Sequence, residues 1–172
     1  MKKEKKKKEE HSALHDFIVY LIILVVVILI RTYLITPVIV SGSSMDTTLQ
    51  DNEIMILNKI NYRFNDIKRF DIVVIKEGKS YIIKRVIGLP NETISYKDDT
   101  LYINEKEQKE YFKNQKTKDF DEVKIDKDCY FVMGDNRKVS LDSRISGCIP
   151  RKQILGKANL VLFPLTKIGY KK

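Results

Sequence analysis

The sequence predicts a mostly β domain that is tethered to a membrane by one N-terminal transmembrane helix. Three observations predict it: an uncharged apolar run near the N-terminus, short runs rich in Val, Ile, Tyr and Phe after it, and no second long apolar run. At 172 residues, the chain has room for one domain of ordinary size once its tails are set aside. We therefore expect a basic cytoplasmic tail at residues 1–16, a transmembrane helix at 17–36 and an extracytoplasmic β domain at 37–172.

The apolar run FIVYLIILVVVILI occupies residues 17–30 and contains no charged residue. Arg31 is the only charged residue between this run and Ile35, and an arginine near a helix end can extend its side chain to the membrane interface. Extended to Ile35, the segment is long enough to cross a bilayer. A buried core helix and a cleaved secretory signal are the alternatives, but the RTYLITPVIV that follows does not offer the small residues of a cleavage site. We expect Pro37 to end the helix.

The positive charge of the chain is concentrated at its start. The net charge is +9, from 32 Lys and Arg against 23 Asp and Glu, and the chain opens with MKKEKKKKEE. Six lysines precede the apolar run and none follows it immediately, so the positive-inside rule predicts a cytoplasmic N-terminus. This predicts a single-pass cell-membrane protein in contact with the lipid bilayer. Nucleic acid is not an expected partner, because the basic block lies across the membrane from the domain.

Short apolar runs separated by polar turns predict β-strands in the rest of the chain. The runs TISY and LYIN, joined by KDDT, are typical of a hairpin. Residues 105–127 are charged and weakly patterned, and we expect a solvent-facing excursion there, with or without one short helix. The expected strands are residues 38–40, 54–57, 71–75, 81–87, 93–96, 101–103, 130–133 and 160–163.

The positions of cysteine and histidine restrict the chemistry of the external domain. Cys129 and Cys148 both lie in it, where a disulfide and two free thiols are both chemically permitted. The only two histidines, His11 and His15, precede the membrane span. A Cys–His pair, a Ser–His–Asp triad and most zinc sites are therefore excluded from the domain, and we expect no metal site.

Residues 40–49, VSGSSMDTTL, place three serines around one glycine just after the apolar segment. Such a cluster is ordinary loop or cap chemistry, or it holds a nucleophile. A serine nucleophile outside the membrane would need a base other than histidine.

The run YIIKRVIG, residues 81–88, contains a candidate base. Side chains alternate along a strand, so Lys84 and Arg85 point to opposite faces, and whichever face is buried carries a cation among apolar neighbours. A buried arginine must pair with an anion, whereas desolvation lowers the pKa of a lysine and leaves a neutral amine that can accept a proton. The alternative is a lysine that reaches solvent or forms a salt bridge at the strand end.

A third stretch, FVMGDNRKVSLDSR at residues 131–144, follows an apolar strand with closely spaced hydrogen-bonding side chains. These side chains hold a long loop in one shape, or orient the lysine and shield it from water. The two interpretations are compatible.

Together these stretches resemble the type I signal peptidases of peptidase family S26, in the short form typical of Gram-positive bacteria. Members of this family are membrane-anchored serine proteases with a Ser–Lys dyad, and their catalytic domain is mostly β. The resemblance extends from the anchor to near the C-terminus. It is carried, in order, by GSSMDTTL, RFDIVVI, YIIKRVIGLP, GDNRKVSLDSR and GKANLVLFP.

The resemblance implies a role for each matching residue. Ser44 becomes the nucleophile and Lys84 the general base. Ser140 becomes a hydrogen-bond partner of the lysine amine, and Asp142 and Arg144 become a charge pair that braces the site. The supporting loop comprises Gly134, Asp135, Asn136 and Arg137.

The resemblance also implies a substrate site around the nucleophile. Gly42 stands where some relatives carry a serine that helps to bind the oxyanion, so backbone N–H groups, including that of Ser44, are expected to bind it here. Ser43 or Ser41 is a candidate helper. Met45 is expected beside the substrate and in the apolar surface that the family places on the membrane.

The implied activity is cleavage of signal peptides from secretory preproteins through an acyl-enzyme, without a cofactor. Preproteins with small residues before the cut and the secretion translocon are the expected partners. Three departures from the family pattern stand out: Thr47 replaces a proline, Phe70 a glycine, and Asn91 a glycine whose left-handed backbone Asn can adopt. The alternatives are a peptidase dedicated to one secreted or pilin-like client, and a catalytically impaired, membrane-tethered binding module.

Overall fold

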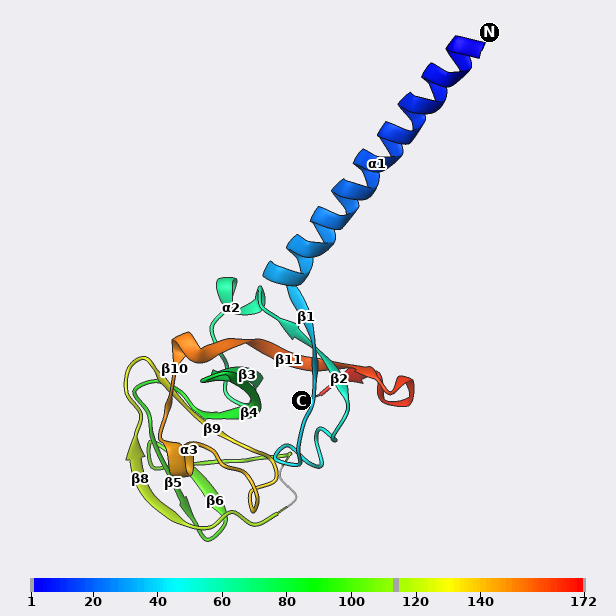
Figure 1. Ribbon diagram of the computed structural model, residues 1–172. Coiled ribbons are helices and arrows are strands. Elements are labelled where there is room, and N and C mark those ends of the chain that lie inside the picture. The colour runs from blue at the N-terminus through cyan, green and yellow to red at the C-terminus, as the bar shows by residue number, and fades with distance from the viewer. Residues whose placement is uncertain (1, 113–114, 172) are drawn as a thin grey trace. The chain divides into compact units, whose positions relative to one another are not determined.

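The structure is a computed structural model that describes residues 2–112 and 115–171, with side chains described from Leu14 onward. It divides into two units, residues 1–35 and residues 36–172. Figure 1 shows the first unit as one helix and the second as a β domain.

The first unit is the helix α1, Lys2–Tyr33. Its segment Leu14–Tyr33 is long and apolar enough to cross a membrane. The helix ends three residues before the predicted boundary at residue 36, and Pro37 does not end it but lies inside the strand β1, Ile35–Ile39. The residue before a proline is disfavoured in a helix, so the helix stops earlier, and a proline is tolerated in β1 because this strand is at the edge of its sheet.

The second unit contains two β-sheets, which confirms the mostly β prediction. The larger sheet has eight strands in the order β1-β2-β11-β3-β4-β9-β10, with β12 paired to β11, and the smaller has the order β7-β6-β5-β8. After β1, the larger sheet comprises β2 (Ile54–Asn58), β3 (Ile72–Glu77), β4 (Ser80–Gly88), β9 (Cys129–Met133), β10 (Ile149–Pro150), β11 (Ile154–Phe163) and β12 (Gly169–Tyr170). The smaller sheet comprises β5 (Thr93–Lys97), β6 (Thr100–Ile103), β7 (Lys106–Gln108) and β8 (Phe120–Lys124).

The helices of this unit are single turns: α2 (Asn61–Phe64), α3 (Ser143–Ser146) and the 3₁₀ turns η1 (Arg151–Gln153) and η2 (Leu165–Lys167). Each of the eight predicted strands overlaps an observed one. The observed β11 starts well before the predicted residue 160, because Gly156 belongs to the strand and not to a turn. A Cβ at Gly156 would lie 2.4 Å from the carbonyl oxygen of Asn58, so glycine allows β11 to approach β2 closely.

The predicted hairpin is present between β5 and β6. Ile94 faces Ile103 and Tyr96 faces Leu101 across the pair. The two turn residues, Asp98 and Asp99, have φ of 50° and 62°, the positive values that a tight two-residue hairpin turn requires.

The predicted solvent-facing excursion at residues 105–127 needs correction; its residues 113–114 lie outside the described part of the chain. The excursion supplies β7 and β8 to the smaller sheet, and its described residues contain no helix. Thr117 is 3% exposed and the side chain of Glu110 only 2%. A charged run predicts solvent exposure only where its charges lack buried partners, and Glu110 pairs with the buried Arg137.

Of the two alternatives for the cysteines, the structure contains the disulfide. Cys129, at the start of β9, is bonded to Cys148, just before β10, with Cα atoms 5.5 Å apart. The segment between them contains the predicted supporting loop.

Candidate active site

Ser44 lies in the turn that follows β1, and the supporting loop holds the backbone of this turn. The carbonyl oxygen of Ser44 accepts a hydrogen bond from the backbone N–H of Asn136 at 3.0 Å. The side chain of Asn136 donates to the carbonyl oxygen of Ser43, also at 3.0 Å. Because Ser44 is held through its main chain, its hydroxyl remains available for chemistry.

Buried apolar side chains anchor the same turn to the core of the domain. Met45 is 2% exposed and packs with Val40, Leu49 and Met55. The prediction that Met45 belongs to the membrane-facing surface is therefore wrong: it anchors the turn in the core. Gly42 has a φ of 88°, and its backbone N–H donates to the Asp51 carboxylate at 2.8 Å, so that N–H is already engaged.

Lys84, on β4, is brought into contact with Ser44 as predicted. Its Nζ donates a hydrogen bond to Ser44 Oγ at 2.8 Å, and the residue is 4% exposed. Desolvation by burial lowers the pKa of Lys84 below its usual value, while the charges of Asp142, Glu77 and Asp135 act in the opposite direction. A larger fraction of the amine is therefore neutral at a given pH than in a solvated lysine.

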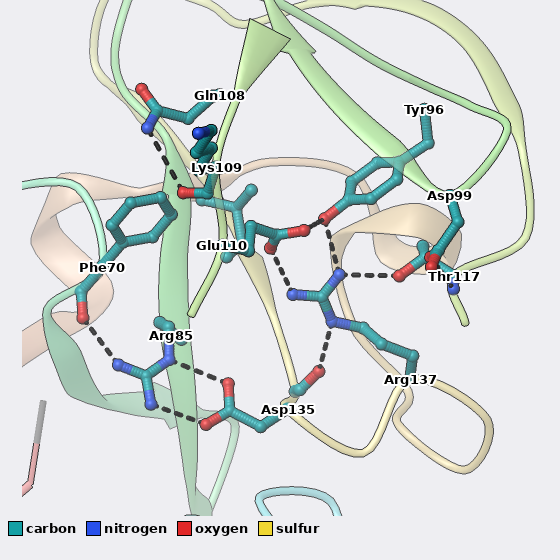
Figure 2. Close-up of polar contacts among 12 residues, drawn as sticks. Phe70, Arg85, Tyr96, Asp99, Gln108, Lys109, Glu110, Thr117, Asp135 and Arg137 are labelled. Carbon is teal, nitrogen blue, oxygen red and sulfur yellow. Dashed lines mark hydrogen bonds and ion pairs between the residues drawn. The ribbon is translucent and has the colours of Figure 1, made fainter. Parts of the chain in front are cut away.

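Arg85, the next residue on β4, is buried on the opposite face and forms an ion pair with Asp135. It is fully buried, and its Nε and Nη2 donate to the two carboxylate oxygens of Asp135 at 2.8 and 2.6 Å (Figure 2). Its Nη1 donates to the carbonyl oxygen of Phe70 at 2.9 Å, and its guanidinium lies 4.0 Å from the centroid of the Phe112 ring. Since Asp135 adjoins Asn136, this ion pair connects the strand that carries Lys84 to the loop that holds Ser44.

Arg137 fixes the other side of the loop through a second buried cluster, drawn in Figure 2. Its guanidinium donates to Glu110 at 2.6 Å, to the Tyr96 hydroxyl at 2.6 Å and to the Thr117 hydroxyl at 2.8 Å. Its Nε donates to the carbonyl oxygen of Gly134 at 3.0 Å. Burial and the neighbouring Glu110 carboxylate raise the pKa of Tyr96, although Arg137 lowers it, so this hydroxyl remains protonated.

Asp142 and Arg144 form the predicted charge pair. Arg144 donates two hydrogen bonds of 2.9 Å to the carboxylate, and the backbone N–H of Gly134 donates a third at 3.1 Å. Burial raises the pKa of Asp142, but these hydrogen bonds outweigh it and hold the pKa below its usual value. Asp142 therefore stays charged and joins α3 to the start of the supporting loop.

The predicted hydrogen bond from Ser140 to Lys84 is not present. Ser140 is 5% exposed, and its Oγ lies near the Asp142 carboxylate, where it helps to lower the pKa of that group, and not on Lys84. Ser140 instead packs against Gly134, where an added Cβ would lie 2.3 Å from its Oγ and 2.4 Å from the carbonyl oxygen of Ser44. Ser140 and the carbonyl of Ser44 thus lie on either side of Gly134.

A small cavity of about 70 Å³ lies beside the two central residues. Ser44 and Lys84 line it together with apolar side chains of the β1 turn and of β4. A separate, larger groove of about 480 Å³ also contains Ser44 and Lys84 in its wall.

Two of the departures from the family pattern keep a glycine-like backbone. Asn91 has a φ of 66°, the left-handed conformation expected for it. Phe70 has a φ of 70°, which is unusual for an aromatic residue. Its N–H donates to the carbonyl oxygen of Val86 at 2.7 Å, and the centroid of its ring lies 5.1 Å from that of Phe112. This hydrogen bond and the ring packing offset the backbone strain.

Several residues around the site carried no recognisable signal in the sequence. Glu110 and Thr117 lie in the weakly patterned excursion, and Glu77 lies at the charged end of β3. Glu110 and Thr117 contact Arg137, which is 27 and 20 residues away, and local periodicity does not report contacts of this kind.

Comparison with known proteins places these features in one family. The family model described as "Signal peptidase, peptidase S26" matches residues 14–163. The chain is 44% identical over 157 residues to signal peptidase I P of Bacillus subtilis subsp. natto, covering 83% of this chain and 85% of that protein. It is 35% identical over 158 residues to signal peptidase IB of Staphylococcus aureus (strain MRSA252), covering 80% of this chain and 83% of that protein.

A solved structure agrees with this similarity. The crystal structure of a signal peptidase I from Enterococcus faecalis V583 superposes with a TM-score of 0.50 at 34% identity, covering 54% of this chain and 97% of that one. With a family model that spans most of the sequence and relatives alike over most of their length, this chain belongs to the peptidase S26 family of signal peptidases.

Proposed function

We propose that this protein is a membrane-anchored signal peptidase, a serine endopeptidase that removes N-terminal signal peptides from secretory preproteins. The observation that carries the proposal is the 2.8 Å contact between Lys84 Nζ and Ser44 Oγ. The domain contains no histidine, since His11 and His15 both precede it. A buried lysine with a lowered pKa is then the base that the site offers to a serine.

The proposed reaction is an acyl transfer. Neutral Lys84 accepts the proton of Ser44 as Oγ attacks the scissile carbonyl carbon, and the resulting ammonium gives that proton to the leaving amine. Water, deprotonated by Lys84, then hydrolyses the ester and frees the signal peptide. Because Gly42 N–H is bonded to Asp51, the N–H of Ser44 is the proposed main oxyanion donor, with the hydroxyl of Ser43 or Ser41 as helper.

The small cavity supports a preference for small residues before the cut. A volume of about 70 Å³ accommodates an alanine-sized side chain but not a large one. The cavity lies between the β1 turn and β4, so a substrate that binds as an extended strand would present its side chain there.

The proposed topology is a single pass with a cytoplasmic N-terminus and an external domain, supported by the apolar helix and the lysines before it. Contact of α1 with the lipid bilayer would confine enzyme and substrate to one plane, which raises their encounter rate. Preproteins that emerge from the secretion translocon are the proposed substrates.

The experiment that tests this function is cleavage of a preprotein with an Ala-x-Ala site by the detergent-solubilised full chain. The native protein is expected to cut at that site, and Ser44→Ala to lower the rate by about 10³-fold or more, because no nucleophile remains. Ser80→Ala, at an exposed serine at the start of β4, is the matched control and should cut at the native rate. A folded native protein that leaves a panel of such preproteins intact would contradict a general signal peptidase and favour a dedicated client or a binding role.

The charge of Glu77 should contribute to the pH dependence of cleavage. Cleavage requires neutral Lys84, so kcat/KM is expected to fall as the pH drops through the pKa of this lysine. Glu77 raises that pKa by its charge, so Glu77→Gln should move the acid limb of the profile to lower pH, and added salt should shrink the shift. Glu107→Gln, at an exposed residue of β7, is the control. A limb that stays in place or moves upward in the Glu77 variant would argue against Lys84 as the base.

Gly134 should be intolerant of a side chain because of its position between Ser140 and Ser44. The Cβ of Gly134→Ala would displace the carbonyl of Ser44, 2.4 Å away, and we expect kcat/KM to fall by about 10²-fold. Gly88→Ala is the control: its Cβ meets the flexible end of Ile125 at 2.3 Å in a cluster that does not include Ser44. It should lower the denaturation midpoint without a comparable loss of kcat/KM. Equal losses of activity in both variants would contradict a positioning effect.

A further inference from the structure

The larger groove beside Ser44 and Lys84 has an apolar wall that the proposed chemistry does not use. Val139, Leu141 and Ile145 line it and are 57%, 76% and 74% exposed. All three belong to the segment between Gly134 and Gly147, the same segment that holds the backbone of Ser44. Exposed large apolar side chains that gather at a groove mark a binding surface more often than chance exposure does.

The backbone contacts of this segment fix where these side chains point. The N–H groups of Val139 and Ser140 both donate to the carbonyl oxygen of Asn136, at 3.3 and 3.2 Å. Ser140 and Asp142 are 5% and 3% exposed, so alternate residues are directed inward and Val139 and Leu141 outward. Ile145 follows on α3, whose first turn is capped by the carboxylate of Asp142. The apolar wall is therefore a preformed part of the site.

We propose that this groove binds the first residues of the substrate after the cut and favours large apolar side chains there. The assignment rests on the proposed function. A peptide cleaved at Ser44 must extend in both directions from it, and Ser44 and Lys84 line two hollows. The cavity of about 70 Å³ suits the small residue before the cut, which leaves the groove of about 480 Å³ for the residues that follow it.

The charges around the groove favour the same ligand. The exposed carboxylate of Glu77 lines it, and the Asp142 carboxylate, which also lines it, is buried and already paired with Arg144. An acidic residue after the cut would face Glu77, and among the described residues that line the groove the only cation is Lys84, whose pKa burial lowers. Acidic side chains should therefore be disfavoured, and apolar side chains should gain contact with Leu141 and Ile145.

The test uses the full chain in detergent and one preprotein with an Ala-x-Ala site. Three versions of the substrate differ only in carrying Leu, Asn or Asp at the first three positions after the cut. The native protein is expected to cut the Leu version with a kcat/KM on the order of tenfold above the Asn version, mainly through a lower KM, and to cut the Asp version slowest. Leu141→Asn combined with Ile145→Asn should collapse the Leu-to-Asn ratio towards one. Phe64→Asn, at an exposed apolar residue outside the groove, is the control and should keep the ratio.

Each other outcome overturns the inference in a recognisable way. Equal cleavage of the Leu and Asn versions by the native protein would refute the apolar preference and leave the proposed function intact. No cleavage of any version by folded protein would refute both. If the double variant lowers cleavage of all versions equally and also weakens binding of the protein to phosphatidylglycerol-containing vesicles, Leu141 and Ile145 face lipid and not substrate.

Discussion

Replacement of Lys84 by methionine is expected to lower kcat/KM for preprotein cleavage by about 10³-fold or more. Methionine has nearly the length of lysine and suits a residue that is 4% exposed, but it cannot accept the proton of Ser44. The measurement is single-turnover cleavage with circular dichroism as the check on folding.

Lys84→Arg separates the role of a base from that of a charge. Arginine stays protonated at every accessible pH, so this variant should be as inactive as Lys84→Met. Substantial activity in Lys84→Arg would mean that a positive charge, and not a neutral amine, is what the site needs.

The same methionine variant should be at least as stable as the native protein. The pKa of Lys84 is lower in the folded state than in the unfolded state, so the unfolded chain binds the proton more readily. The native state therefore loses stability as the pH falls below the unfolded pKa, and this loss is present at neutral pH. Lys84→Met removes it, and its denaturation midpoint should not fall.

Asp135→Ala, in contrast to Lys84→Met, is expected to destabilise the protein, with a loss of about 3–5 kcal/mol in the free energy of unfolding. The substitution leaves Arg85 buried without its carboxylate, and arginine cannot escape the cost by deprotonating. The phenyl ring of Phe112 and the carbonyl of Phe70 remain as partners but do not neutralise the charge. Urea denaturation of the solubilised chain measures the loss.

Two further variants identify the cause of that loss. Glu122→Ala, at an exposed acid on β8, should change stability by no more than about 0.5 kcal/mol. Arg85→Met combined with Asp135→Ala should be more stable than Asp135→Ala alone, since the unpaired charge is gone. If the double variant is the less stable one, the cost arises from lost packing and not from an unpaired guanidinium.

The strand that carries Lys84 and Arg85 shows how much of the burial of side chains the alternation along a sequence can predict. Period-two alternation predicted that one of two adjacent cations would be buried, and that an arginine would pair while a lysine would lose its charge. The structure buries both residues, and each responds as its chemistry requires: Arg85 pairs with Asp135, and the pKa of Lys84 is lowered. The pairing of Ser44 with Lys84 and that of Asp142 with Arg144 followed from the resemblance to the signal peptidases and not from alternation.

Contacts between distant segments were not predictable in this way. Arg137 meets Glu110, 27 residues away, and neither residue lies in a periodic run. Met45 follows Ser44 directly, yet only the three-dimensional path of the turn decides that it is buried and not exposed. The position of the Ser140 side chain against Gly134 also depends on packing, which sequence similarity does not specify.

Because Cys129 and Cys148 form a disulfide, oxidised and reduced preparations of the protein differ in covalent structure. The 19-residue separation spans the whole segment that supports Ser44, and closing a loop of that length restricts the unfolded chain by about 3 kcal/mol. Protein purified with a reducing agent would lack this restraint, whereas protein exported to an oxidising exterior would retain it. Activities measured in the two kinds of buffer would therefore describe two covalently different enzymes.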